Sequence, residues 1–194
     1  MLKNIKNTLL IGLVTVMILS ACSVTRDWKI FAIEEEPNID IQFRLPPEWR
    51  VDYAPTPNTP GQWDILLAPP KCAEDQETLY SDNCIDLTVY IKGEANYDQQ
   101  DSIAFASQSF ALTESGSEQT VLMGQSAFKV HGLEVQRFDH KVFVGEDEIQ
   151  LSFYFFETEK ADYTFLTEFP YDEREEGEAA QNFSRLLESI EVID

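Results

Sequence analysis

The stretch Ile85–Lys92 (IDLTVYIK) alternates strictly between apolar side chains and polar or amphipathic ones. A period of two is that of a β-strand, because successive side chains point to opposite faces. The apolar face of this segment comprises Ile85, Leu87, Val89 and Ile91. A strand with one apolar face is typical of an antiparallel sheet packed against a core.

The same alternation occurs in Ile39–Leu45 and Ile149–Phe156. In the first segment we expect Ile39, Ile41, Phe43 and Leu45 to face the core, and Asp40, Gln42 and Arg44 to face outward. In the second we expect Ile149, Leu151, Phe153 and Phe155 to be buried, and Gln150, Ser152, Tyr154 and Phe156 to face outward. Both segments are therefore predicted as half-buried strands.

Shorter candidate strands are Lys29–Ile33, Trp63–Leu67, Leu133–Phe138, Lys141–Val144 and Tyr163–Thr167. Val144–Glu148 (VGEDE) predicts the turn of a hairpin. Tyr53–Gly61 (YAPTPNTPG) is rich in proline and is predicted as a loop.

Helical periodicity marks two segments. Asp98–Leu112 begins with acidic residues, which favour the positive end of a helix dipole, and its apolar face is Ile103, Ala106 and Phe110. Asp172–Ile190 carries a clearer stripe of Ala179, Phe183, Leu186, Leu187 and Ile190. Acidic residues again crowd its beginning, at Asp172, Glu173, Glu175 and Glu176. Strands and helices together predict one α+β domain over residues 29–194, an antiparallel β-sheet flanked by helices.

Short motifs add a family resemblance to this prediction. Phe43–Trp49 (FRLPPEW) resembles the strand, Pro, x, Trp segment of the PsbP/Mog1-like superfamily, which includes DcrB-type bacterial lipoproteins. Gly124–Ala127 (GQSA) is similar to its Gly-x-x-Ala element, and Phe183–Ile190 is similar to its closing helical segment. The resemblance covers most of residues 30–194. It implies the same sheet-and-helix fold and roles as assembly factors, chaperones or binding proteins.

The N-terminus reads as an export signal. Lys3 and Lys6 precede an apolar run, Leu9–Leu19, which is too short for a stable transmembrane span. The tetrapeptide Leu19–Cys22 (LSAC) resembles the lipobox of bacterial lipoproteins, which implies cleavage after Ala21 and acylation of Cys22. An ordinary secretory peptide with a chance cysteine is the alternative. Residues 1–21 are thus the expected lipoprotein signal peptide.

Acyl chains on Cys22 would anchor the protein stably in a membrane. Residues 22–28 form the expected tether, and the six residues Ser23–Trp28 reach roughly 20 Å when extended. In bacteria with two membranes, Ser23 after the lipidated cysteine resembles the signal for the outer membrane. We therefore expect an outer-membrane protein that faces the periplasm.

The chain is strongly acidic, with 14 Lys and Arg against 35 Asp and Glu, a net charge of −21. Signal cleavage would remove two lysines and no acid, so the mature charge would be 12 − 35 = −23. Such a charge disfavours binding to nucleic acid and attracts cations or basic proteins. A solvated acidic surface without a dedicated partner is the alternative.

Cys72 and Cys84 are the other two cysteines of the chain. In an oxidising compartment, cysteines this close in sequence usually pair, and the polar segment between them reads as a loop. We expect a structural disulfide that stabilises by roughly 3 kcal/mol in the chain-entropy model. A metal or redox site would show the CxxC spacing, which is absent.

No catalytic constellation stands out in the sequence. His131 and His140 are predicted as surface or turn residues, and the chain has no GxSxG elbow. We expect no enzyme activity, no metal centre and no cofactor. Calcium remains an alternative through Asp139 or the Gly145–Glu148 turn, although neither has the regular calcium-loop spacing.

Aromatic residues are the remaining candidates for a binding surface. Those at polar-facing positions of predicted strands are Trp49, Trp63, Tyr90, Tyr154 and Phe156. They would form a binding surface if that face of the sheet is open, and core if helices cover it. The function we expect is a non-enzymatic, membrane-anchored envelope lipoprotein that binds a protein partner. The alternatives are an immunity protein against a basic toxin and a binder of calcium or a small molecule.

Overall fold

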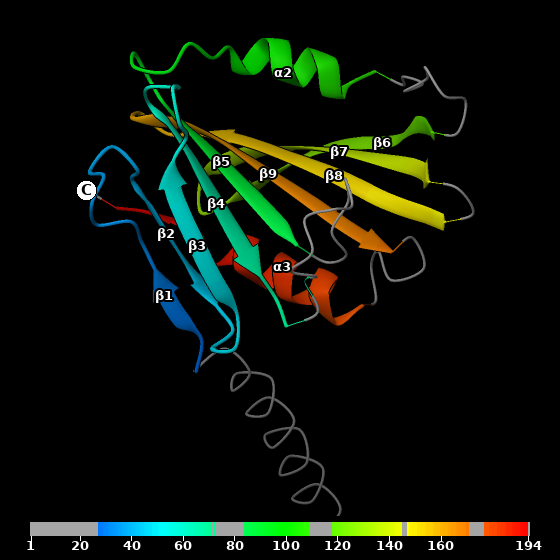
Figure 1. Ribbon diagram of the computed structural model, residues 1–194, viewed down its shortest axis with the longest axis horizontal. Helices are drawn as coiled ribbons and strands as arrows, with labels where there is room; N and C mark the ends of the chain where they lie inside the picture. Colours follow the sequence, from blue (N-terminus) through cyan, green and yellow to red (C-terminus); the bar gives the residue numbers. More distant parts are fainter. Residues whose placement is uncertain are drawn as a thin grey trace, which may run out of the picture.

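The computed structural model describes residues 27–70, 72, 84–108, 118–144, 147–170 and 177–193 (Figure 1). Within these residues, seven strands form one antiparallel sheet in the spatial order β3-β4-β5-β9-β8-β7-β6. Their bounds are β3 (Arg50–Pro55), β4 (Gln62–Ala68), β5 (Ile85–Ile91), β6 (Glu118–Val130), β7 (Leu133–Val144), β8 (Asp147–Glu157) and β9 (Ala161–Pro170). We call this the large sheet.

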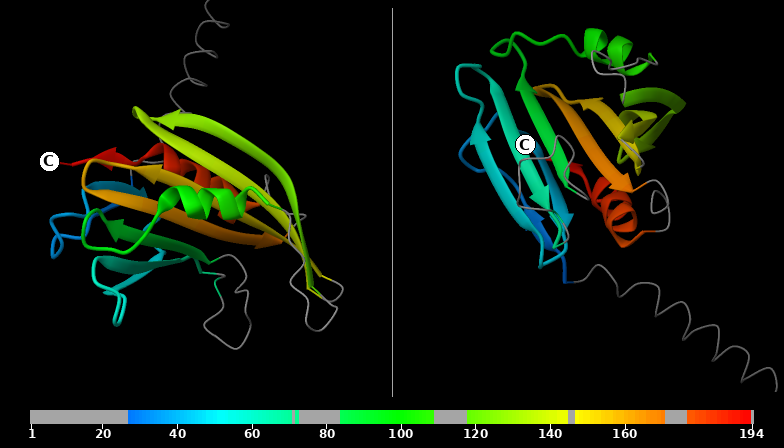
Figure 2. Two further views of the ribbon diagram at one scale, coloured as in Figure 1. Left: turned by 90° about the horizontal axis from the view of Figure 1, so that it is seen from above. Right: turned by 45° about the vertical axis from the view of Figure 1, so that its right-hand side comes forward.

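A small sheet and helices cover the two faces of the large sheet. β2 (Ile41–Leu45) pairs with β1 (Lys29–Phe31) on one side and with β10 (Glu191–Val192) on the other. α3 (Glu178–Glu188) lies with this small sheet, whereas α2 (Gln99–Ala106) lies on the opposite side of the large sheet (Figures 1 and 2). The predicted α+β class, an antiparallel sheet flanked by helices, is confirmed.

The main core lies between the large sheet and the layer formed by α3 and β2. Phe165 of β9 packs edge-on against Phe43 of β2 at 6.3 Å and Phe183 of α3 at 5.6 Å between ring centroids. A second apolar cluster lies under α2 and includes Phe138 and Phe155. Burying one such ring stabilises the fold by roughly 1.5–3 kcal/mol, so both faces of the large sheet contribute to stability.

The face of β8 that points to the main core is the opposite of the predicted one. Ser152 and Tyr154 are buried there, while Ile149 and Leu151 are half-buried on the α2 side. The prediction that Phe156 faces outward is wrong, since it is 2% exposed. Because both faces of β8 are covered, its alternation does not reveal which face meets the larger core.

β7 is one continuous strand in place of the two predicted segments Leu133–Phe138 and Lys141–Val144. The intervening polar residues pair in register with β8, Asp139 with Ser152 and His140 with Leu151. His140 is therefore inside a strand and 0% exposed, so its prediction as a surface or turn residue is wrong. His131 does lie in an exposed turn, with a left-handed φ of 47°.

The hairpin predicted around Val144–Glu148 is confirmed, because β7 and β8 pair up to Val144 and Asp147. Residues 145–146 lie outside the described residues. β3 includes Tyr53–Pro55, the start of the predicted proline-rich loop. Proline is tolerated there because β3 is an edge strand of the large sheet.

Asp40 is buried, although alternation predicted it on the solvent side. Its Oδ1 accepts hydrogen bonds from the Tyr163 hydroxyl at 2.8 Å and the Thr158 hydroxyl at 2.7 Å. These donors satisfy a carboxylate that is 4% exposed. Asp40 thus links the small sheet to the turn between β8 and β9.

The helices are shorter than predicted within the described residues. α2 ends at Ala106, and α3 begins at Glu178. Phe110 and the acidic residues of 172–176 lie outside the described residues, as do the signal peptide, Cys22 and the tether up to residue 26. Among the helices that are described, none is long and apolar enough to cross a membrane.

Candidate binding groove between helix α2 and the sheet

A groove of about 880 Å³ lies between α2 and the large sheet, and we call it the α2 groove. Five neighbouring strands, β3, β4, β5, β9 and β8, contribute to its floor, and α2 with Tyr97 forms its roof. The described lining residues are Asp52, Tyr53, Ala54, Asp64, Ile65, Leu66, Asp86, Leu87, Thr88, Tyr90, Tyr97, Asp101, Ser102, Phe105, Ala106, Phe153, Phe155, Thr164 and Leu166. Ligand-binding clefts commonly have volumes of about 300–1,000 Å³.

The strand register gives the floor a direction. One row across the five strands contains Asp52, Leu66, Asp86, Leu166 and Phe153. Neighbouring strands lie roughly 4.8 Å apart, so the row is about 19 Å long. Its carboxylates, Asp52 and Asp86, lie on β3 and β5 on either side of Leu66, and Leu166 and Phe153 continue the row on β9 and β8.

The next row on the same face repeats this polarity. It contains Ala54, Asp64, Thr88, Thr164 and Phe155. Asp64 is again at the β4 end, and Phe155 is again at the β8 end. The carboxylates of the floor are therefore at the β3–β5 end, and its phenylalanines are at the β8 end.

Polar contacts hold the roof in place. Asp98 caps α2 by accepting a hydrogen bond from the Gln100 amide at 2.9 Å. Gln99 Nε2 donates to the Phe156 carbonyl at 3.0 Å, and the Tyr97 hydroxyl lies 3.3 Å from Thr164 Oγ1. These bonds tie the beginning of α2 to β8 and β9.

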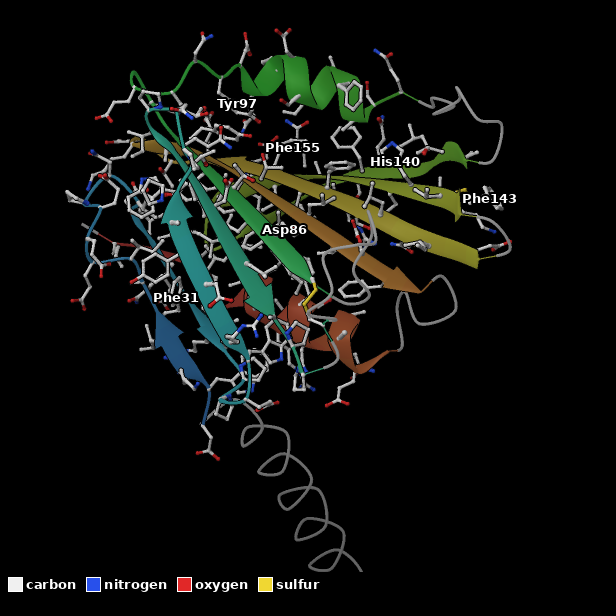
Figure 3. All side chains as sticks on the ribbon, viewed as in Figure 1. Phe31, Asp86, Tyr97, His140, Phe143 and Phe155 are labelled. Atoms are coloured by element: carbon white, nitrogen blue, oxygen red, sulfur yellow. A yellow bond between two sulfur atoms is a disulfide. The ribbon has the colours of Figure 1, made fainter. Side chains whose placement is uncertain are left out.

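Aromatic side chains line the groove from both sides. Tyr97 stacks on Tyr90 of β5 with ring centroids 3.6 Å apart and the planes nearly parallel. Burial, followed by the neighbouring Tyr97, raises the pKa of Tyr90 to about 12. Figure 3 shows Tyr97 and Phe155 between α2 and the large sheet. Phe105 of α2 is 59% exposed and is accessible to a bound molecule.

The acidic end contains a carboxyl group with a perturbed pKa. Asp86 is exposed on the groove floor, but partial burial of its carboxyl group raises its pKa, and the negative charge of Asp64 raises it further. Asp64 accepts hydrogen bonds from Thr56 Oγ1 at 2.6 Å and from Gln62 Nε2 at 3.2 Å. Two carboxylates on adjacent strands therefore repel each other in a site where a cation would stabilise both.

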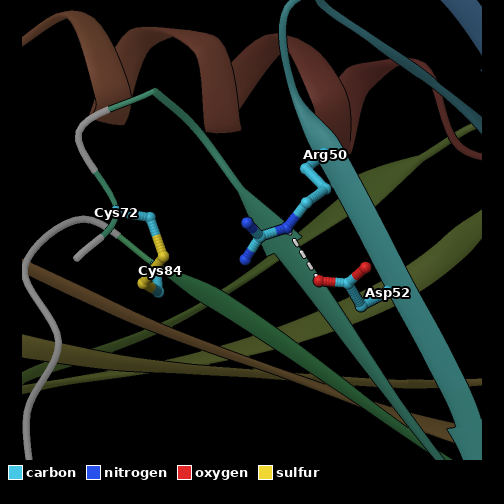
Figure 4. The surroundings of a disulfide bond; sticks show 4 residues. All are labelled: Arg50, Asp52, Cys72 and Cys84. Carbon is cyan, nitrogen blue, oxygen red and sulfur yellow. Dashed lines mark hydrogen bonds and ion pairs between the residues drawn. A yellow bond between two sulfur atoms is a disulfide. The ribbon is translucent and has the colours of Figure 1, made fainter. Parts of the chain in front are cut away.

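Figure 4 shows the disulfide together with Arg50 and Asp52, and Asp52 is one of the residues that line the groove. Cys72 and Cys84 are joined, with Cα atoms 4.9 Å apart, and Cys84 directly precedes β5. It closes the connection between β4 and β5, the strands that carry Asp64 and Asp86. On β3, Arg50 pairs with Asp52 at 2.8 Å.

His140 lies on the α2 side of the sheet, near the end of that helix (Figure 3). Its ring packs edge-on against Phe153 at 5.6 Å between centroids. Burial lowers the pKa of His140, and hydrogen bonding to backbone groups of Gln108 and Ala106 acts in the opposite direction. The imidazole is therefore favoured in its neutral form beneath the end of α2.

The binding residues predicted from the sequence do not all lie on the same face of the large sheet. Trp49 is 4% exposed and Tyr154 is 6% exposed, and both belong to the main core. Tyr154 packs on Phe183 of α3 at 5.0 Å, so the alternative of a helix-covered face holds for it. Trp63 is half-buried against the same core, while Tyr90 lines the α2 groove.

The calcium candidate Asp139 is engaged by protein donors. Its Oδ1 accepts hydrogen bonds from Ser152 Oγ at 2.6 Å, Arg137 Nε at 2.8 Å and Gln150 Nε2 at 3.2 Å. Within the described ranges, no three His, Cys, Asp or Glu side chains are grouped as around a metal ion.

No protein-family model matches this chain, and no curated protein matches it. Solved structures similar to it include the cyanobacterial PsbP protein CyanoP of Synechocystis sp. PCC 6803, with 16% identity, 85% of this chain and 92% of that chain covered, and a TM-score of 0.47. Another is LpqN of Mycobacterium tuberculosis, described as involved in cell envelope biogenesis, with 10% identity, 87% and 93% coverage, and a TM-score of 0.45.

Proposed function

We propose that this protein is a non-enzymatic, lipid-anchored protein of the bacterial envelope that binds a partner protein in the α2 groove. The observation that carries the proposal is the groove itself, about 880 Å³ between α2 and the sheet. Its accessible walls are largely apolar and aromatic, and the carboxylates of its floor, Asp52, Asp64 and Asp86, lie on the neighbouring strands β3, β4 and β5. Such a distribution favours binding and orientation of a ligand.

The anchor is proposed from the N-terminal sequence. The tetrapeptide Leu19–Cys22 supports acylation of Cys22, cleavage after Ala21 and a short tether to Trp28. Ser23 supports the outer membrane, with the domain facing the periplasm. Metabolic labelling with a palmitate analogue should mark the wild-type chain and leave Cys22→Ala unlabelled. Equal labelling of both would contradict the anchor.

The net charge of −21 supports a basic partner, because opposite charge accelerates association and selects against acidic partners. The PsbP/Mog1-like resemblance of the sequence supports a role in assembly or binding. An antibacterial toxin is one kind of basic partner, and its identification would specify the proposed function as immunity.

Capture of the full-length lipidated chain from gently solubilised envelopes tests the binding function. Thr88 lies on the groove floor, so the Trp side chain of Thr88→Trp should fill the groove. This variant should no longer recover the partner. Ser126→Trp adds the same bulk on an exposed part of β6 and should retain it. Equal recovery of one stoichiometric partner by both variants would place the binding surface elsewhere.

A further inference from the structure

We propose that the α2 groove receives a basic, partly apolar peptide segment of the partner, oriented with its Lys or Arg side chain at the β3–β5 end. An aromatic or branched aliphatic side chain of the same segment would lie at the β8–β9 end. This inference rests on the function proposed above and names the chemistry of the bound segment.

Charge complementarity carries the first half of the inference. Asp64 and Asp86 lie on the floor at the β3–β5 end, and Asp101 of α2 also lines the groove. The described lining residues include no Lys, Arg or His, and Arg50 is paired with Asp52 of β3. A cationic side chain in this position would pair with carboxylates and lie near the stacked ring of Tyr90.

The apolar end carries the second half. The half-buried Phe153 and Leu166 on the floor and the exposed Phe105 of α2 supply accessible apolar surface here, beside the buried Phe155 and Ala106. Apolar area removed from water by a bound side chain favours binding at this end. A fully hydrophilic basic segment would leave this surface in water.

The length of the floor sets the size of the segment. The row from β3 to β8 crosses four strand spacings, about 19 Å in total. An extended chain advances roughly 3.3–3.6 Å per residue, so five or six residues span the row. The segment would run across the strands, and its cationic and apolar side chains would be several residues apart.

Isothermal titration of the full chain, held in nanodiscs of uncharged phosphatidylcholine, tests the inference directly. The probe is the hexapeptide Lys-Arg-Gly-Ala-Leu-Phe. Its controls are Glu-Glu-Gly-Ala-Leu-Phe, which reverses the charge, and Lys-Arg-Gly-Ala-Ser-Ser, which removes the apolar end. We expect the probe to bind at least tenfold more tightly than either control. Equal affinities would overturn the inference.

Charge variants distinguish a specific binding site from a general electrostatic attraction between a basic peptide and an acidic protein. Asp64→Asn with Asp86→Asn should weaken probe binding at least tenfold. Glu134→Gln with Glu188→Gln changes the net charge equally at exposed positions outside the lining and should change affinity less than twofold. Equal losses of affinity in the two double variants would contradict a specific site in the groove.

A second variant tests the apolar end without disturbing a core. Phe105 is 59% exposed, so the Phe105→Ala variant should fold normally. Its affinity for the probe peptide should be lower than that of the wild type. Phe128→Ala, on β6 and outside the lining, is its matched control and should bind as the wild type does. If Thr88→Trp loses the captured partner but the wild type binds none of the peptides, this inference fails and the proposed function stands.

Discussion

Asp86 illustrates how a single residue of the groove is held at a cost in stability. Its pKa is raised in the folded protein above the ordinary value of 3.8, so its contribution to stability is full below that pH. The contribution is lost as the pH rises through the folded-state pKa. At neutral pH the ionised carboxylate therefore disfavours folding.

We predict that Asp86→Asn raises the free energy of unfolding at pH 7 by up to about 0.5 kcal/mol. The gain is small because Asp86 is exposed on the groove floor, where water screens much of the effect that raises its pKa. The gain should shrink toward zero as the pH falls below 4. Urea denaturation at both pH values measures this difference, with Glu134→Gln as the control. A variant less stable than the wild type at pH 7 would contradict the prediction.

His140 should give the protein a pH-dependent stability of the opposite kind. Its pKa is lowered in the folded state, so the unfolded chain binds protons first as the pH falls below about 6.5. Stability is full above that pH and falls below it. We predict that the wild type loses more free energy of unfolding between pH 7.5 and 5.5 than His140→Leu does.

The exposed His131 supplies the control for this experiment. His131→Gln should keep the same loss between the two pH values as the wild type. If His140→Leu and His131→Gln behave identically, burial of His140 does not govern the acid sensitivity.

Residue positions were predictable from the sequence only where the pattern was unambiguous. All four apolar residues of Ile85–Ile91 are buried, as predicted. Asp40 and His140 broke the pattern because hydrogen bonds from Tyr163 and Thr158, or packing against Phe153, compensate for their burial. Those partners are distant in sequence, and alternation carries no information about them.

At the scale of elements, α2 depends on its cap. It has eight residues, and the Asp98 carboxylate satisfies the backbone amide of Gln100. Loss of such a cap costs roughly 1 kcal/mol. We predict that Asp98→Ala speeds hydrogen exchange in α2 about fivefold, the factor that corresponds to this free energy.

α3, on the opposite face, is the internal control for this measurement and should exchange at the wild-type rate. Since α2 is the roof of the groove, the same variant should also lower the recovery of the captured partner. Faster exchange throughout both helices would show a general loss of stability instead.

Most strands were predictable because they carry one apolar face, and the predicted helices are present at both places. The strands β3, β6 and β10 were not predicted. The role of α2 as a roof was not predictable. Periodicity identifies an apolar face of a helix, such as Ile103 and Ala106, but not the surface that it meets. β8 has two covered faces, so its alternation gave the wrong orientation.

For the whole molecule, the disulfide supports the acidic end of the groove by closing the connection between β4 and β5. We predict that Cys72→Ser with Cys84→Ser lowers the free energy of unfolding by roughly 3 kcal/mol. Urea denaturation measures the loss, and a reductant should produce the same loss in the wild type. No change on reduction would contradict a structural role.

The groove itself could be predicted only in part. Tyr90 was singled out from its polar-facing position. The excess of acidic residues left two interpretations open, a basic partner and a solvated acidic surface. Asp64, Asp86 and Phe155 were not identified, because they come together through the order β4-β5-β9-β8, in which β9 lies between β5 and β8. Spatial strand order is a property of the folded molecule that local patterns do not report.

Site-specific photocrosslinking in the envelope tests the central claim most directly. A photoreactive residue at Ser102, which lines the groove from α2, is compared with one at the exposed Glu134 outside it. The account predicts one partner adduct from position 102 and none from position 134. An adduct from position 134 without one from position 102 would contradict binding in the groove.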